Sequence, residues 1–69
     1  MKLNEERIVM ITNAIGLAVL DLRFRKELIT KYSLTEKLEE MRNSEISKEG
    51  IDVCRDAAEL VRGGALPGA

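Results

Sequence analysis

The chain has 69 residues, of which 45% are hydrophobic and 33% charged, a composition typical of one globular domain and not of a disordered segment. Its net charge of −1 and pI of about 5.4 provide no overall basic field to bind nucleic acid or an anionic membrane. It has no histidine and one cysteine, which excludes histidine-based catalysis, most zinc sites and an internal disulfide, and which fits a reducing cytoplasm. We therefore expect a cytoplasmic protein that is not an enzyme and that takes no metal and no cofactor.

Residues 4–20 are predicted to form the first helix, with Asn4 as its N-cap. Apolar residues occupy nearly its whole circumference, so we expect this helix to lie at the centre of the fold or under a partner. Asn13 and Asp21 interrupt the apolar run before the ~20 residues that a membrane span requires, and we predict no membrane segment. Gly16 is interpreted as the mark of a close helix crossing, because glycine costs ~1 kcal/mol against alanine inside a helix.

A second helix is predicted over residues 21–31, with Asp21 as its N-cap. Phe24, Leu28 and Tyr32 follow one another at a spacing of four residues, which places them on one face of a helix. The other face is basic. Two interpretations stay open for it, a solvated surface or a set of phosphate contacts in a helix-turn-helix protein. The basic residues are Arg23, Arg25, Lys26 and Lys31.

The third predicted helix begins at a capping box formed by Ser33 and Glu36, and ends near Asn43 and Ser44. Its apolar stripe comprises Leu34, Leu38 and Met41.

A fourth helix is predicted to begin after Ser47 as N-cap, with Ile46 and Ile51 packed as a hydrophobic staple. Cys54 lies on its apolar stripe and is interpreted as a packed core thiol, because no histidine is present to activate it. Gly63 suits the left-handed position after the helix.

These elements predict an all-α bundle of four to five short helices, with a helical domain over residues 1–62 and a flexible C-terminal tail over residues 63–69. Gly63 and Gly64, with Val61 before them, resemble a double-glycine leader cleavage site. A helix cap followed by a frayed tail explains the same residues, and both interpretations stay open.

Two segments resemble a known family. "AVLDLRFRKELI" is similar to the A-x-x-D-x-x-F-R-x-x-L-L signature of small helical leader domains, and "YSLTEKLEEMR" is similar to the Y-x-L-T-x-E-x-x-x-L-R segment that follows it. Such domains belong to the nitrile-hydratase-like leader clan of ribosomally synthesised and post-translationally modified peptide (RiPP) precursors, and the precursors of split borosins are similar in design. The spacer between the two segments is shorter here than is usual in that family. The matching residues are Asp21, Phe24, Arg25, Leu28, Tyr32, Leu34, Thr35, Glu36, Met41 and Arg42.

The resemblance implies a RiPP precursor whose helical leader docks on a modifying enzyme and presents its tail as the substrate. The enzyme that the resemblance favours is a SAM-dependent backbone N-methyltransferase. The implied partner-binding residues are Phe24, Arg25, Leu28, Tyr32, Leu34 and Met41, and the implied modified residues are Ala65, Leu66, Gly68 and Ala69. Pro67 has no N–H and is excluded as an amide methylation site.

Two other classes of protein stay open. One is a small interaction module or accessory subunit, either a homodimer or the partner of an enzyme, that uses the apolar surface of the first helix. The other is a DNA-binding regulator, which the acidic pI disfavours because nucleic-acid binding depends on a basic surface.

Overall fold

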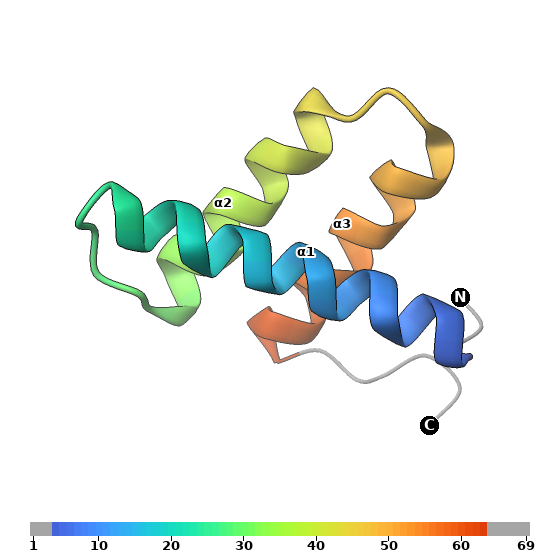
Figure 1. Ribbon diagram of the computed structural model, residues 1–69, viewed down its shortest axis with the longest axis horizontal. Coiled ribbons are helices and arrows are strands. Elements are labelled where there is room, and N and C mark those ends of the chain that lie inside the picture. Colours follow the sequence, from blue (N-terminus) through green and yellow to red (C-terminus); the bar gives the residue numbers. More distant parts are fainter. Residues whose placement is uncertain (1–3, 64–69) are drawn as a thin grey trace.

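The computed structural model describes residues 4–63, and this part of the chain forms three α-helices joined by two short connections (Figure 1). They are α1 (Glu5–Phe24), α2 (Lys31–Ser44) and α3 (Lys48–Arg62). Residues 4–63 contain no strand, so the predicted all-α class is confirmed, whereas the predicted number of four to five helices is too high.

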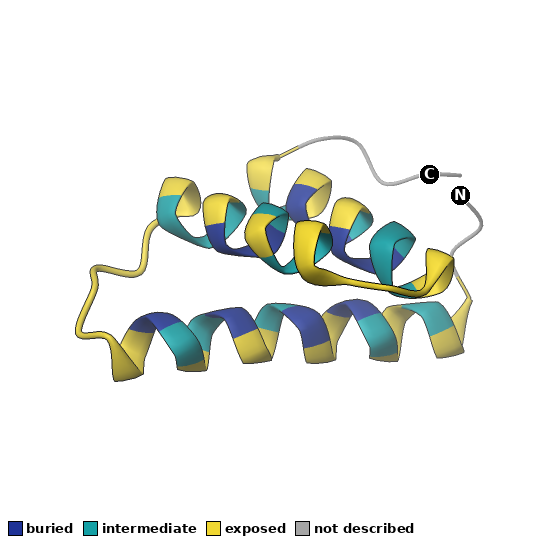
Figure 2. Cartoon of the chain, turned by 90° about the horizontal axis from the view of Figure 1, so that it is seen from above, coloured by how far each residue is buried: buried dark blue, intermediate teal, exposed yellow. Residues whose placement is uncertain are grey.

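The three helices are arranged in two layers. α2 and α3 lie side by side, and α1 crosses both of them from the other layer (Figures 1 and 2). One face of α1 is therefore covered by the other two helices, and the opposite face is exposed along its length (Figure 2). Of the two alternatives predicted for the first helix, burial all round within this chain is wrong, and cover by a partner stays a prediction.

α1 is longer than predicted because Asp21 does not begin a new helix. Asp21 lies inside α1, and its carboxylate pairs with Lys37 of α2 and with Arg25. The helix ends at Phe24, followed by a turn in which Lys26 adopts a left-handed conformation with φ of 57°. The Lys26 N–H donates to the Arg23 carbonyl at 3.0 Å and the Glu27 N–H donates to the Leu22 carbonyl at 3.0 Å, which is the Schellman pattern of a helix end.

α2 begins three residues earlier than predicted. Thr30 is its N-cap: the Thr30 hydroxyl accepts from the Ser33 N–H at 3.1 Å, and the Ser33 hydroxyl accepts from the Thr30 N–H at 2.9 Å. The capping box therefore joins Thr30 to Ser33, and the predicted box of Ser33 with Glu36 is wrong. Both pairs have the same spacing in the sequence, and the cap that forms is the one that also satisfies the polar groups of the preceding turn.

The predicted ends of the other helices are mostly confirmed. Asn4 caps α1 by accepting from the Arg7 N–H at 2.8 Å, and Ser47 caps α3 by accepting from the Gly50 N–H at 3.0 Å. Gly63 ends α3 in the left-handed region with φ of 97°. The hydrophobic staple before α3 does not form, because Ile46 is 96% exposed.

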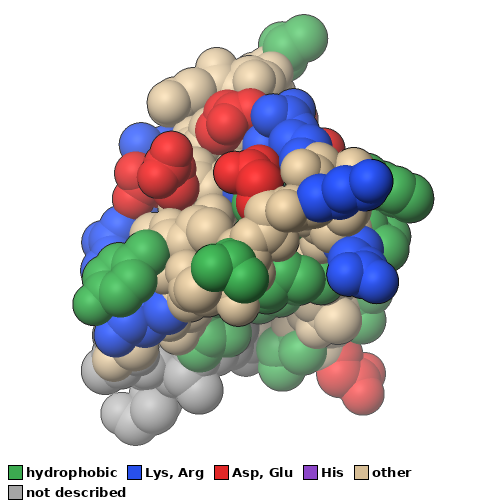
Figure 3. Space-filling view, turned by 90° about the vertical axis from the view of Figure 1, so that its left-hand side faces the viewer, with side chains coloured by type: hydrophobic (Ala, Val, Ile, Leu, Met, Phe, Trp, Pro, Cys, Tyr) green, Lys and Arg blue, Asp and Glu red, His purple; other side chains and the backbone are tan. Residues whose placement is uncertain are grey.

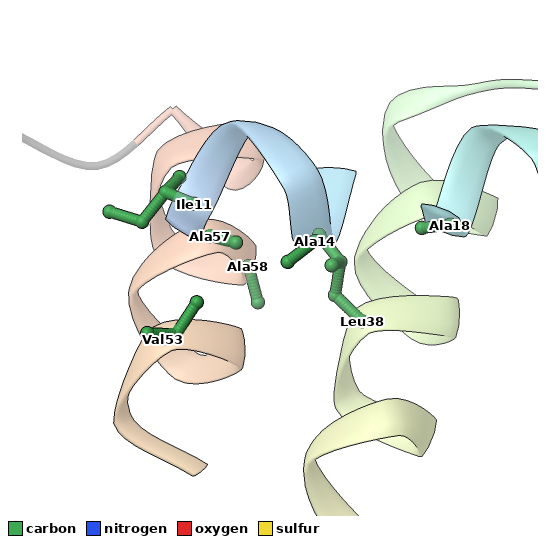
Figure 4. Packing of buried hydrophobic residues seen from close by; sticks show 7 residues of the cluster. All are labelled: Ile11, Ala14, Ala18, Leu38, Val53, Ala57 and Ala58. Atoms are coloured by element: carbon green, nitrogen blue, oxygen red, sulfur yellow. The ribbon is translucent and has the colours of Figure 1, made fainter. Parts of the chain in front are cut away.

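The core between the layers is built largely from small side chains (Figure 4). Leu38 of α2 is its largest fully buried side chain, and it points toward Ala14 of α1. Four alanines among the buried residues let the helix backbones approach closely. Cys54 is buried in α3, which confirms its prediction as a packed thiol. The buried hydrophobic residues are Ile11, Ala14, Ala18, Leu22, Leu38, Val53, Cys54, Ala57 and Ala58.

Candidate docking surface

The largest apolar side chains of this protein are mostly outside its core. An isolated exposed leucine is ordinary in a folded protein, but a contiguous group of large apolar side chains marks an interaction surface. In this protein the alanines are buried in the core, whereas ten larger hydrophobic residues are each more than one-third exposed to water. These are Ile8, Val9, Leu17, Leu20, Phe24, Leu28, Ile29, Tyr32, Ile46 and Leu60.

Four of the ten lie in and beside the connection between α1 and α2, and we call Phe24, Leu28, Ile29 and Tyr32 the turn patch. Phe24, Leu28 and Tyr32 are 81%, 84% and 78% exposed. Phe24 and Leu28 also line a shallow hollow together with Arg23, Lys26 and Glu27. Figure 3 views this end of the molecule and shows hydrophobic side chains standing between lysine and arginine side chains.

The spacing of four residues predicted that Phe24, Leu28 and Tyr32 would share one helix face, and the structure brings them to the same end by a different route. Phe24 is the last residue of α1, Leu28 lies in the connection, and Tyr32 belongs to the first turn of α2. Ile29, which is 47% exposed, was missed as a member of this group. The spacing of four residues that joins Phe24, Leu28 and Tyr32 does not include Ile29, so this signal could not find it.

A hydrogen-bonded turn fixes the backbone beneath the turn patch. The Ser33 hydroxyl accepts from the Thr30 N–H and donates to the Leu28 carbonyl at 2.7 Å. The Ser33 side chain therefore takes part in the cap of α2 and also fixes the backbone of Leu28. The Schellman turn at Lys26 fixes the other end of the connection. A connection held at both ends loses little conformational freedom on binding a partner, which favours recognition.

The charges around the turn patch are partly engaged with their neighbours. Arg25, which is a predicted partner-binding residue, extends its Nε to 3.3 Å from Asp21 Oδ2. The Lys31 ammonium lies 5.6 Å from the centroid of the Tyr32 ring, in a cation–π contact. This arrangement combines apolar anchors with a positive rim, which suits a partner surface that is apolar at its centre and acidic at its edge.

The remaining two predicted partner-binding residues lie elsewhere. Leu34 and Met41 are half-buried and pack against the core cluster from α2. Met41 also lines a hollow between α1 and α2 beside Lys37 and Leu17. Much of the surface of both residues is therefore used in the fold itself.

The C-terminal end of α3 is held in place by ionic and backbone contacts. Arg62, the last residue of α3, pairs with Glu39 of α2 and with Glu59 of its own helix. The Gly63 N–H donates to carbonyl groups of the preceding turn. The predicted modified residues Ala65, Leu66, Gly68 and Ala69, like Gly64 of the double-glycine pair, lie outside the described residues.

An ionic cluster beside the turn patch ties α1 to α2. Asp21 Oδ2 lies 2.6 Å from Lys37 Nζ, and Lys37 Nζ also lies 3.3 Å from Glu40 Oε1. The hydrogen bond from Lys37 lowers the pKa of Asp21, and the same bond raises the pKa of Lys37. Both charged forms are therefore stabilised at neutral pH, which indicates a structural role for this cluster.

Cys54, the buried thiol of α3, is not an activated nucleophile. Burial raises the pKa of the Cys54 thiol, and the Glu45 carboxylate adds to this shift. Such a thiol is mostly protonated at neutral pH and is a poor nucleophile. Within residues 4–63 no three side chains of the metal-ligating types come together as a metal site, and no helix of that range is long and apolar enough to cross a membrane.

Comparison with known proteins adds no relative: no protein-family model, no curated protein and no solved structure matches this chain. Any function of this chain is therefore inferred from its own residues and from the two segments that resemble helical leader domains.

Proposed function

We propose that this protein is a RiPP precursor, in which the helical body is a leader domain that docks on a modifying enzyme through the turn patch. The tail after Gly63 is the substrate in this proposal, and the enzyme is a backbone N-methyltransferase that uses SAM as methyl donor. The observation that carries the proposal is the turn patch, because its most exposed apolar residues are also conspicuous positions of the two family-like segments.

The structure supports a docking role for Phe24, Leu28 and Tyr32 through their exposure. Residues that only stabilised the fold would be buried, as Leu38 is. Aromatic side chains supply a large apolar contact area at a small cost in conformational entropy, so Phe24 and Tyr32 are suitable anchors for a partner.

In this proposal the covalent link between the helical body and the tail helps the enzyme to act on the tail. A substrate segment tied to a docked domain reaches the active site at a high effective concentration, so its own sequence can bind weakly. Ala69, the farthest of the proposed modified residues, lies six positions after Gly63, and an extended chain of this length spans at most ~20 Å. An active site that acts on Ala65, Leu66, Gly68 or Ala69 would therefore lie within about 20 Å of the end of α3.

Co-expression with a methyltransferase encoded beside the precursor, followed by mass spectrometry, tests this function. We expect one methyl group or more on the amide nitrogens of the residues after Gly63, and a complex that survives gel filtration. An unmodified tail without a detectable complex would contradict the proposal.

A matched pair of variants tests the docking surface. Leu28→Glu is expected to weaken binding to the enzyme at least tenfold, because it places a charge at the centre of the turn patch. Ile46→Glu is the control. Ile46 is 96% exposed and, like Leu28, lies in a connection between helices, but its connection joins α2 to α3 and is not part of the turn patch. Equal loss of binding in both variants would show that the turn patch is not the docking surface.

A further inference from the structure

The outer face of α1 is a second exposed apolar surface, distinct from the turn patch. Val9, Leu17 and Leu20 are 57%, 60% and 53% exposed, although they belong to the longest helix of the protein. Figure 2 shows this exposed side of α1 facing away from α2 and α3. The 20 residues of α1 give this face a length of about 30 Å.

The residues on this face have the spacing of a coiled-coil seam. Val9, Asn13, Gly16 and Leu20 follow one another at intervals of four, three and four residues, which are the intervals between alternate core positions of a heptad repeat. Leu17 lies beside this line. A heptad seam that faces solvent is complementary to another helix with the same seam.

Gly16 lies in the middle of the seam, and the fold of a single chain gives it no role. A Cβ atom built on Gly16 meets nothing within 4 Å, so alanine would fit and would favour the helix. The sequence predicted that Gly16 marks a close helix crossing, but α2 and α3 cover the opposite face of α1. A second helix against the outer face is the crossing that would require glycine at this position.

We propose that the outer face of α1 binds the same face of a second copy of this chain, with the two α1 helices antiparallel about a two-fold axis. In the register that centres the seam, Val9 lies opposite Leu20 of the second copy, and Asn13 lies opposite Gly16 of the second copy. The small glycine leaves room for the Asn13 carboxamide. A polar residue at one core position of a seam is a known means of fixing the register of a helix pair.

The charges at the ends of the seam select this antiparallel pairing. Continuing the heptad intervals in both directions leads to Glu6 at one end and to Arg23 at the other. The register that pairs Val9 with Leu20 also places Glu6 opposite Arg23 of the second copy, and the two-fold axis repeats this ion pair. A parallel pairing would oppose Glu6 to Glu6 and Arg23 to Arg23, which is repulsive. Both residues are exposed, and neither forms an ion pair with another residue of the range 4–63.

A dimer of a protein of this size is expected to have a small interface. The protein has a surface of 5013 Å², and an interface typically covers about a tenth of the surface of a small protein, roughly 500 Å² per copy here. The total of roughly 1,000 Å² stands at the lower limit for a biological interface. We therefore expect a dissociation constant in the micromolar range.

This dimer does not depend on the proposed enzyme partner, because its seam residues are not those of the turn patch. Sedimentation equilibrium of the purified chain tests it directly. We expect a reversible monomer–dimer equilibrium that Leu20→Glu weakens at least tenfold, whereas Ile46→Glu leaves it unchanged. A chain that stays monomeric at millimolar concentration would overturn the proposal.

A charge exchange tests the register. Glu6→Arg and Arg23→Glu should each weaken the dimer, because each change opposes like charges across the seam. The double variant Glu6→Arg/Arg23→Glu should restore it, since each new charge then faces its opposite on the second copy. If the double variant lost at least as much free energy of dimerisation as the two single variants together, this pairing would be overturned.

Cross-linking separates the two orientations. A Val9→Cys chain mixed with a Leu20→Cys chain should form a mixed disulfide dimer, whereas the Val9→Cys chain alone should not cross-link above the wild-type level, because its two new cysteines lie about 16 Å apart along the axis. The opposite pattern would overturn the antiparallel arrangement.

Gly16→Ala should raise the Tm of the monomer and weaken the dimer, a combination that loss of folding cannot produce.

Discussion

Asp21 of α1 and Lys37 of α2 meet at 2.6 Å, and this contact joins the long helix to the α2–α3 pair. Lys37 is 6% exposed, so its ammonium is largely removed from water and depends on the Asp21 and Glu40 carboxylates for compensation. The same contact explains why Asp21, a good helix-capping residue, lies inside a helix.

This ion pair predicts how stability depends on pH. The pKa of Asp21 is lowered in the folded state, so its contribution is present above the unfolded value of about 3.9 and is lost as the pH falls through the folded pKa. The pKa of Lys37 is raised, so its contribution is present below about 10.4 and is lost as the pH rises through the folded pKa. Thermal unfolding followed by circular dichroism should show a plateau of Tm between these limits. Asp21→Asn should lower the plateau and flatten its acid side, whereas an unchanged acid limb would show that Asp21 carries none of this dependence.

A single glycine substitution should stabilise the end of α1. Lys26 adopts a φ of 57°, a conformation that costs a non-glycine residue about 1 kcal/mol. Lys26→Gly is expected to raise the free energy of unfolding by about 0.5–1 kcal/mol, as measured by urea denaturation. Lys26→Ala, which retains the strain and removes the same charge, is the control. Equal stability of the two variants would show that the backbone conformation is not the source of the effect.

The Ser33 hydroxyl should matter both for the fold and for the turn patch. Ser33→Ala removes the acceptor for the Thr30 N–H and the donor to the Leu28 carbonyl. We expect a loss of about 1 kcal/mol in the free energy of unfolding and faster amide hydrogen exchange in residues 25–30. Ser44→Ala is the control, because the Ser44 hydroxyl bonds only within its own helix, to the Glu40 carbonyl. Unchanged exchange in the connection would contradict this role.

Leu38 should be the residue on which the core depends most. It is fully buried between the layers, while much of the surrounding cluster is alanine. Leu38→Ala is expected to cost about 2–5 kcal/mol, which unfolds much of a domain of this size at 37 °C. Leu60→Ala, at a leucine that is 37% exposed, should cost much less. Similar losses in the two variants, measured by urea denaturation, would contradict the described core.

Cys54 should react slowly with thiol reagents in the folded protein. Its side chain is buried, and its raised pKa leaves little thiolate at neutral pH. We expect alkylation by iodoacetamide, followed by mass spectrometry, to be many times slower than in urea. A rate equal to that of the unfolded chain would show that α3 does not protect the thiol.

Local signals in the sequence predicted the parts of the fold that depend on a few neighbouring residues. Asn4, Ser47 and Gly63 were identified correctly because a cap is completed within one helical turn. Prediction from such local signals failed at residues 21–33 for two reasons. Thr30 and Ser33 both offer an N-cap for α2, and the left-handed position at the end of α1 holds Lys26 instead of glycine. The spacing predicted that Phe24, Leu28 and Tyr32 lie together on one helix face, whereas the connection brings them to one end of the molecule and leaves them exposed.

The sequence by itself determined the all-helical class and most of the capping residues, since helix periodicity and caps depend on interactions within a few residues. The apolar circumference of α1 predicted either burial all round or a partner. Only the tertiary structure decided which side of α1 became the core and which became a surface. The physical reason is that α2 and α3 pack against the side with Ala14 and Ala18, whose small side chains let the helices approach closely, and leave Val9, Leu17 and Leu20 facing water.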